Sequence, residues 1–273
     1  MEILNKISVK NIEQFYKHPN NKKINIKVLE DINLDIEEGQ FVCIVGPSGC
    51  GKSILLNIIG GLVNPTKGNV LVDSNEVKGP GSDRGMVFQG YALLPWRTVL
   101  QNVELGLEIN KVPKKKRKEL AKKFIHLVGL SKYEKYYPGQ LSGGMRQRVA
   151  IARGLAYDPK VLLMDEPFSA LDAQTREILQ QELLGIWEKT KKTIIFVTHS
   201  VDEAIYLSNE IIIMGSNPGR IVKTLNVNLP YPRSHDDSEF QRLRKEIWSE
   251  ISDQVNTGSD AKNNQRCDNY EIA

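Results

Sequence analysis

Eight consecutive residues combine three glycines with a lysine and two serine hydroxyl groups. They fit the pattern G-x-x-x-x-G-K-[ST] and are Gly46, Pro47, Ser48, Gly49, Cys50, Gly51, Lys52 and Ser53. Glycines let backbone N–H groups point inward, and a helix N-terminus adds partial positive charge, so such a loop suits a polyphosphate. Lys52 would reach the β- and γ-phosphates, and Ser53 would place its hydroxyl on Mg²⁺. The alternative is a glycine-rich turn with a chance lysine. The flanking pattern, a buried strand at 41–45 and a helix from Gly51, disfavours that alternative and predicts a nucleotide-binding loop.

Two carboxylates and a histidine follow other apolar runs. Asp165 and Glu166 come directly after Val161–Met164, and His199 follows Thr193–Thr198. The carboxyl ends of strands are where open α/β sheets bind ligands. Asp165 would hold Mg²⁺, directly or through water, and Glu166 would take a proton from an attacking water. Strand-end acids also occur in ordinary loops, and a lone histidine is usually structural. The shared sheet edge favours catalytic acids and a γ-phosphate contact from His199.

A second glycine loop lies at Ser142, Gly143 and Gly144, before a helix expected to begin near Met145. This arrangement makes another anion-ready helix N-terminus, with Ser142 as a hydroxyl donor. One nucleotide site does not need two such loops. We therefore expect the second loop to close on nucleotide held by a second copy of the chain, because symmetric dimers form reciprocal sites.

The elements that must position these residues alternate along the chain. Strand patterns at Ile7–Ile12 and Val28–Ile36 enclose a polar loop at Lys17–Lys23, helical patterns fill 99–156, and strand–helix alternation returns beyond residue 158. This order predicts an α/β fold with a parallel sheet that is covered on both faces. We expect one domain over 3–250, ending in a helix at Phe240–Ile251, and a disordered polar tail at 251–273.

Composition narrows the class of protein. The 273 residues are 40% hydrophobic and 26% charged, as in ordinary globular proteins, and no apolar run approaches 18 residues. The first residues lack the order of a signal peptide, and the scattered Cys43, Cys50 and Cys267 favour a cytoplasmic protein. A net charge of +4 without an aromatic-interleaved basic stripe argues against nucleic acid.

Two further features each allow more than one interpretation. The basic run Lys114–Lys118 could touch lipid headgroups or an acidic partner, but a solvated first helical turn is favoured. Tyr16 is an ordinary strand aromatic or a platform for a nucleotide base, and the enrichment of aromatic residues in strands favours the ordinary role.

Taken together, the motifs over about residues 3–230 resemble the ATP-binding subunits of ABC transporters. The resemblance rests on the first glycine loop, Gln89, Leu141–Met145, Val161–Pro167, Ser169–Asp172 and His199. It implies that Tyr16 stacks on adenine, which reverses the interpretation above. It also implies that Gln89 is the glutamine that senses Mg²⁺ and the permease, Asp172 the D-loop aspartate, Glu166 the catalytic base and His199 the switch histidine.

Finer features are similar to the nitrate/sulfonate/taurine-type importer branch: Pro80–Gln89, Leu93–Arg97 and Asn217–Arg220. The chain departs from the pattern at two positions. Met145 replaces a common glutamine, so no polar ribose contact is carried over to it. Ile54 replaces a usual threonine, which should matter little because Ser53 already supplies the hydroxyl.

The resemblance implies the fold of a P-loop NTPase with a RecA-like parallel sheet core, an N-terminal antiparallel β subdomain and an inserted helical subdomain at about 95–156. It also implies Mg-ATP hydrolysis coupled to import. Two copies would form a head-to-tail dimer at the cytoplasmic face of the membrane, bound to permease subunits and served indirectly by an extracytoplasmic solute-binding protein. A soluble ABC ATPase acting on ribosomes or DNA is the rival, but those usually carry two cassettes or a coiled-coil insertion. A non-hydrolysing regulator is disfavoured by Glu166 and His199. Nitrate, sulfonates, taurine, bicarbonate and thiamine precursors all stay open as solutes.

Overall fold

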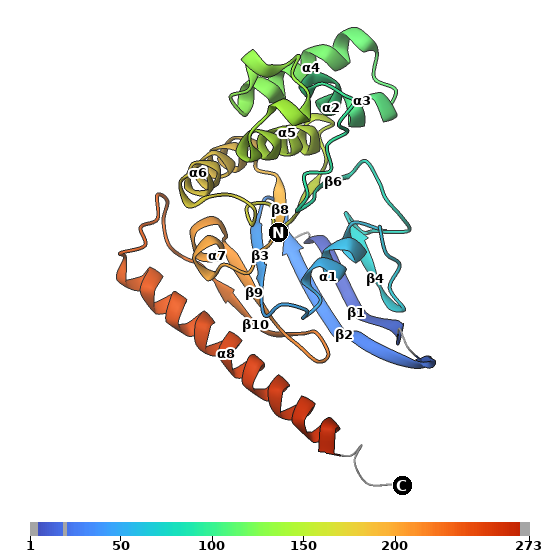
Figure 1. Cartoon of the computed structure of the whole chain (residues 1–273), viewed down its shortest axis with the longest axis vertical. Helices are drawn as coiled ribbons and strands as arrows, with labels where there is room; N and C mark the ends of the chain where they lie inside the picture. The colour runs from blue at the N-terminus through green and yellow to red at the C-terminus, as the bar shows by residue number, and fades with distance from the viewer. Residues whose placement is uncertain (1–4, 19–20, 268–273) are drawn as a thin grey trace.

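A six-stranded sheet runs through the centre of the molecule (Figure 1). The computed structural model describes residues 5–18 and 21–267, with the backbone alone for residue 22 and residues 255–267. The strand order is β10-β9-β3-β8-β7-β6, in which β10 is antiparallel to β9 and all other pairs are parallel. The strands are β3 (Phe41–Val45), β6 (Arg84–Val87), β7 (Val161–Asp165), β8 (Thr193–Val197), β9 (Glu210–Gly215) and β10 (Arg220–Asn226). The predicted parallel core is confirmed.

Helices and a second sheet cover the two faces of this sheet. Every residue of β3 and β8 is buried, which explains their continuous apolar sequences. Along β3, Phe41, Cys43 and Val45 enter one hydrophobic cluster, whereas Val42 and Ile44 enter another on the opposite face. The first cluster includes residues of α5 (Gly143–Ala156), α6 (Ala173–Thr190), α7 (Val201–Leu207) and α8 (Ser238–Cys267). The second includes α1 (Lys52–Ile59) and the other sheet.

That other sheet is antiparallel, as predicted, in the order β2-β1-β4-β5. Its strands are β1 (Asn5–His18), β2 (Asn21–Glu37), β4 (Lys67–Val72) and β5 (Asn75–Glu76). The predicted polar loop at Lys17–Lys23 is wrong, because Lys17 pairs with Asn25 and His18 with Asn21. This end of the hairpin is largely exposed. Because neither face of it is buried, its sequence shows no alternation of apolar and polar residues. Residues 19–20 lie outside the described residues.

Between β6 and β7 the chain forms a group of helices at one end of the molecule, uppermost in Figure 1. They are α2 (Val99–Val103), α3 (Leu105–Ile109), α4 (Lys114–Leu127), α5 and the 3₁₀ turns Ser131–Tyr133 and Pro138–Gln140. Thr98 caps α2 with a reciprocal capping box, and Gly129, at φ +70°, follows α4 as the predicted stop. Side chains of these helices, among them Val103, Leu107 and Ile125, belong to the same cluster as Phe41.

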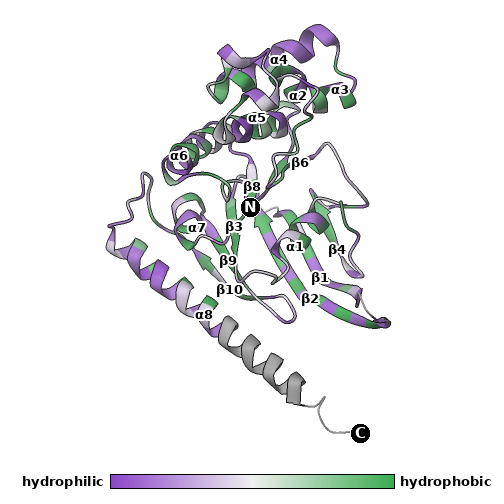
Figure 2. Cartoon of the chain, in the orientation of Figure 1, coloured by the Kyte–Doolittle hydropathy of each residue, from purple (hydrophilic) through white to green (hydrophobic). Residues whose placement is uncertain are grey.

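The basic run opens α4. Lys114, Lys115 and Lys116 are exposed, and only Ala121 and Ile125 of this helix are buried. Figure 2 accordingly shows α4 mostly in the hydrophilic colour. A solvated first turn, the favoured interpretation, fits this exposure.

The last helix, α8, runs along the sheet beside α7 and β9 (Figure 1). Its buried stripe is Phe240, Leu243, Ile247 and Ile251, spaced three to four residues apart. The predicted helix ends at Ile251, but the described helix continues to Cys267. Once the packed half is formed, each further residue adds one backbone hydrogen bond, which favours continuation. The sequence predicted disorder from residue 251 onward, whereas the structure has a helix as far as Cys267. Residues 268–273 lie outside the described residues.

Candidate active site

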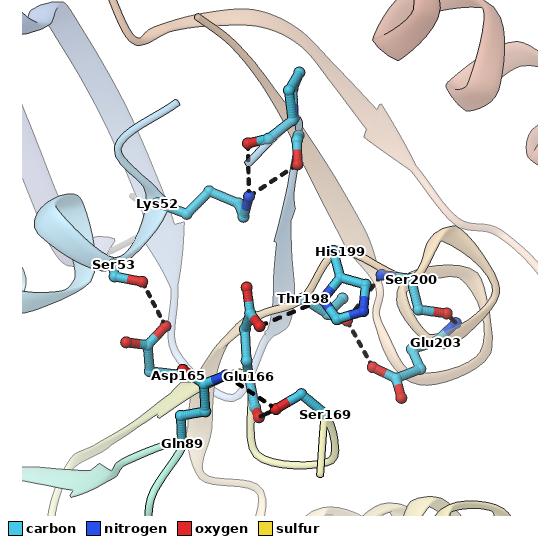
Figure 3. Close-up of polar contacts among 12 residues, drawn as sticks. Lys52, Ser53, Gln89, Asp165, Glu166, Ser169, Thr198, His199, Ser200 and Glu203 are labelled. Carbon is cyan, nitrogen blue, oxygen red and sulfur yellow. Dashed lines mark hydrogen bonds and ion pairs between the residues drawn. The ribbon is translucent and has the colours of Figure 1, made fainter. Parts of the chain in front are cut away.

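The first glycine loop connects β3 to α1 and is too tight for side chains at two of its glycines. Gly51 has φ +96°, and a Cβ there would lie 2.6 Å from Leu29 Cδ2. A Cβ at Gly46 would lie 2.4 Å from the carbonyl oxygen of Met214. Lys52 is only 6% exposed, and its Nζ donates to the carbonyl oxygens of Gly46 at 2.8 Å and Pro47 at 3.0 Å (Figure 3). Residues 46–53 thus form a narrow loop around the buried amino group of Lys52.

Ser53 and Asp165 meet at the end of β7. Ser53 Oγ donates to Asp165 Oδ1 at 2.9 Å, joining two motifs 112 residues apart (Figure 3). Burial raises the pKa of Asp165, an effect that the Ser53 hydrogen bond opposes. Among the described residues no group of three or more His, Cys, Asp and Glu side chains gathers as a metal cluster. A hydroxyl and one carboxylate nevertheless suit Mg²⁺, which takes hard oxygen ligands and shares its shell with substrate phosphates.

Glu166 and His199 form a second pair. His199 Nδ1 lies 3.3 Å from Glu166 Oε2, and the side chains are 60% and 22% exposed respectively. Glu166 has φ +42°, an uncommon value for a residue other than glycine, and its N–H donates to the carbonyl of Val197 at 2.9 Å. The carboxylate that follows Asp165 is therefore turned toward the end of β8, where His199 begins the next loop (Figure 3).

Ser169 links this pair to Gln89. Its Oγ donates to the carbonyl of Glu166 at 2.9 Å and accepts from Gln89 Nε2 at 3.3 Å. Gln89 is therefore bonded to Ser169 rather than to Ser53 or Asp165, the other two predicted metal ligands. Sequence reasoning gave Ser169 no role of its own. Its place three residues after Glu166 was the available signal, because that spacing allows a side chain to bond the preceding turn.

The second glycine loop lies at the start of α5, and its neighbours differ from those of the first glycine loop. Ser142 caps α5 by accepting the N–H of Met145 at 3.3 Å, and Asp172 caps α6 by accepting the N–H of Thr175 at 2.9 Å. That bond lowers the pKa of Asp172. A Cβ on Gly143 would meet Tyr91 and Leu171, and one on Gly144 would meet Thr175.

Within the described residues, no hydrogen bond or ion pair joins residues 142–144 to residues 46–53. Tyr16 lies on β1 opposite Ile26 and is 41% exposed. The structure therefore gathers Lys52, Ser53, Asp165, Glu166, His199 and Gln89, but leaves Tyr16, Ser142, Gly143, Gly144 and Asp172 outside this group.

A cleft of about 530 Å³ is lined by residues of both the inserted helices and the central sheet. It is lined mainly by apolar side chains, including Leu62, Phe88, Leu105, Ile109 and Tyr157. Arg153 of α5 also lines it and donates to the carbonyls of Ala92 and of Tyr91, the latter at 2.8 Å. Tyr91 and Ala92 both have positive φ, so Arg153 holds a strained segment just after Gln89. Sequence reasoning had not singled out Arg153.

Comparisons with known proteins decide the family. A profile of the ABC transporter family matches residues 29–169. The chain belongs to the ABC transporter family. An uncharacterized ABC transporter ATP-binding protein of Methanocaldococcus jannaschii is 55% identical over 250 residues, 92% of each chain. An aliphatic sulfonates import ATP-binding protein of Bacillus cereus is 48% identical over 240 residues, covering 88% of this chain and 94% of that one.

Solved structures give the same family. A dimeric bacterial ABC transporter cassette matches with a TM-score of 0.72 and 36% identity, over 82% of this chain and all of that one. A dimeric cassette bound to ADP and Pi in a post-hydrolysis state matches with a TM-score of 0.72 and 35% identity. The predicted family and fold are confirmed, and this ABC cassette is an ATP-binding ATPase of the transporter class. None of these matches supports the rival acting on ribosomes or DNA. None of the described helices combines the length and apolar character that a bilayer crossing requires.

Proposed function

We propose that this ABC cassette is the Mg-ATP-hydrolysing subunit of an importer for a small solute of the sulfonate, taurine or nitrate kind. The observation that carries the proposal is the meeting of two pairs, Ser53 with Asp165 and Glu166 with His199, beside the buried Lys52. Relatives named as aliphatic sulfonates import proteins, at 47–50% identity, favour a sulfonate among these solutes.

Each residue of the site has a proposed task. The backbone of residues 46–51 binds the phosphates, Lys52 moves from its carbonyl partners to the β- and γ-phosphates, and Tyr16 stacks on adenine. Ser53, Asp165 and Gln89 hold Mg²⁺, which supplies positive charge to the phosphate oxygens. Glu166 takes a proton from the attacking water, and His199 fixes the carboxylate and contacts the γ-phosphate.

The site is completed by a second copy. Because Ser142, Gly143, Gly144 and Asp172 lie apart from the glycine loop of their own chain, we propose that they close on the nucleotide of the partner in a head-to-tail dimer. The dimeric cassettes among the structural matches support this arrangement.

The cassette would sit at the cytoplasmic face of the membrane as a peripheral subunit. Permease helices would occupy the 530 Å³ cleft beside Gln89, where Ile109 and the nearby Trp96 are 70% and 71% exposed. An extracytoplasmic solute-binding protein would act only through the permease.

The substitution Glu166→Gln tests the proposed base. It keeps the shape of the side chain but removes its basicity, so the ATPase rate should fall by about 10²–10⁴-fold with ATP affinity unchanged. Glu182→Gln is the matched control, because Glu182 is a partly buried acid paired with Arg148 away from the site. ATPase at near wild-type rate in Glu166→Gln contradicts the proposal.

For the solute, proteoliposomes with the permease should hydrolyse ATP faster when the binding protein carries an aliphatic sulfonate than when it carries nitrate.

A further inference from the structure

A buried carboxylate stands behind the switch histidine. Glu203, in the first turn of α7, is 7% exposed, and both of its oxygens have partners. Oε2 accepts from Thr198 Oγ1 at 2.6 Å, and Oε1 accepts from Gln180 Nε2 at 3.3 Å. Oε1 also lies 3.5 Å from Arg176 Nε. Burial raises the pKa of Glu203, whereas the Thr198 hydrogen bond and the Arg176 charge lower it.

Glu203 fixes the chain on both sides of His199. Thr198, which is 2% exposed, precedes the histidine, and its Oγ1 also accepts the N–H of Ser200 at 3.0 Å. Ser200 Oγ in turn accepts the N–H of Glu203 at 3.3 Å (Figure 3). The imidazole itself is largely exposed and has one long contact with Glu166. Its position is therefore set mainly by its backbone, which these bonds hold.

The same carboxylate reaches the D-loop. Arg176 donates through its second terminal nitrogen to the carbonyl of Leu171 at 3.0 Å, and Leu171 directly precedes Asp172. Gln180 lies one turn further along the same helix, α6. Glu203 thus joins two segments whose tips belong to different parts of the proposed composite site: residues 198–200, with His199, and residues 169–172, which would face the partner's nucleotide.

Stability alone does not account for this arrangement. A buried ion pair is often no more stable than apolar residues of similar volume, because desolvation offsets the attraction. Helix α7 already has a cap in Ser200, so its N-terminus does not require Glu203. What the carboxylate adds is a fixed position of one loop relative to the other.

We propose that Glu203 is a positioning residue, which holds His199 against Glu166 and ties it to the D-loop through Arg176. This inference rests on the proposed role of His199. Misplacement of a reacting group by about 1 Å can cost about 10²-fold in rate, so loss of this anchor should lower kcat by about 10–100-fold. KM for ATP should change less than about twofold, because the glycine loop is untouched.

The test compares Glu203→Gln with the wild type, alone and in a His199→Ala background, by steady-state ATPase of the full chain. The expected result is a lower kcat with unchanged KM in the first background and no further loss in the second. An equal fold loss in both backgrounds would mean a general structural effect and overturns the proposal, as does a wild-type kcat. If His199→Ala itself keeps full activity, the proposed function of His199 fails instead.

A second pair of variants covers the case in which Glu203→Gln does not fold. Thr198→Ser keeps the hydroxyl that donates to Glu203, whereas Thr198→Val keeps the shape and loses the hydroxyl. We expect near wild-type kcat for the serine variant and a reduced kcat for the valine variant, with melting temperatures measured for both. Equal kcat values for the two variants overturn the proposal. Glu182→Gln again serves as a control with a paired acid on α6.

Discussion

The composite site can be tested at Gly143, because the structure leaves room there within the chain. A Cβ on Gly143 would lie 3.4 Å from Tyr91 Oη and 3.5 Å from Leu171 Cδ2, which are ordinary contacts. A Cβ on Gly144 would lie 2.6 Å from Thr175 Cγ2, so substitution there disturbs the chain itself. Gly143→Asp should therefore fold normally and bind ATP as a monomer, while placing a carboxylate toward the phosphates of the partner.

The size of the effect follows from the charges. Two like charges about 5 Å apart repel by about 3 kcal/mol at an effective dielectric constant of about 20. That energy corresponds to about two orders of magnitude in the dimerisation constant for each site. Gly143→Asn is the matched control, because it adds nearly the same bulk without the charge. The difference between the two variants isolates the electrostatic contribution.

The assay is sedimentation of the ATP-bound dimer in the Glu166→Gln background, where slow hydrolysis preserves the ATP. We expect the asparagine variant to dimerise more weakly than the parent. The aspartate variant should dimerise about 10⁴-fold more weakly still, because the head-to-tail dimer contains two such sites and each contributes about 10²-fold. Both should bind ATP with the affinity of the parent in calorimetry. If the aspartate and asparagine variants dimerise equally, the loop does not face a phosphate of the partner, and the head-to-tail arrangement is refuted.

Three further predictions concern the loop, the C-terminal segment and a buried thiol. Lys52→Ala should lower ATP affinity by at least about tenfold in calorimetry, because charge-assisted hydrogen bonds contribute about 1.5–3 kcal/mol, and unchanged affinity contradicts its role. Arg233→Met should lower the melting temperature by roughly 4–16 °C in calorimetry, since it unpairs carbonyls of Ile205, Ser208 and Leu229 at a cost of about 2–4 kcal/mol; a shift below about 2 °C contradicts this. Burial raises the pKa of Cys50 above its usual 9.0, so at pH 8 this residue should stay a thiol. Its alkylation, followed by peptide mass spectrometry, should be far slower in native than in denatured protein, and equal rates contradict the burial.

The sequence predicted the parts of the site that lie on regular elements. The glycine loop and the Asp165–Glu166 pair each follow a buried apolar strand, and parallel strands bring their carboxyl ends to one edge. Ser169, Arg153 and Glu203 were missed because their contacts with Gln89, Ala92 and Arg176 join segments that meet only in the fold. Ser169 bonds Gln89 across 80 residues, and Arg153 bonds Ala92 across 61. Neither spacing leaves a local pattern in the sequence.

The errors in the predicted elements have a similar origin. Periodicity reports a buried face, so it failed where strands β1 and β2 pair without one at Lys17 and Asn25. It also failed beyond Ile251, where the described helix continues to Cys267. For Tyr16 the resemblance replaced the ordinary strand role by that of a platform for adenine, and this role stays a prediction.

The shared hydrophobic cluster limits how this cassette can be re-engineered. Val103, Leu107 and Ile125 of the inserted helices pack in the same cluster as Phe41 and Phe196 of the central strands. An insert taken from a relative to change permease partners would therefore have to match the sheet side chains beneath it, because volume changes in a close-packed interior are felt by all neighbours. Exchanging exposed residues, such as Ile109 of the cleft and the nearby Trp96, leaves that cluster intact. If permease helices occupy the cleft as proposed, partner choice in this chain is consequently more open to surface grafting than to exchange of the whole helical segment.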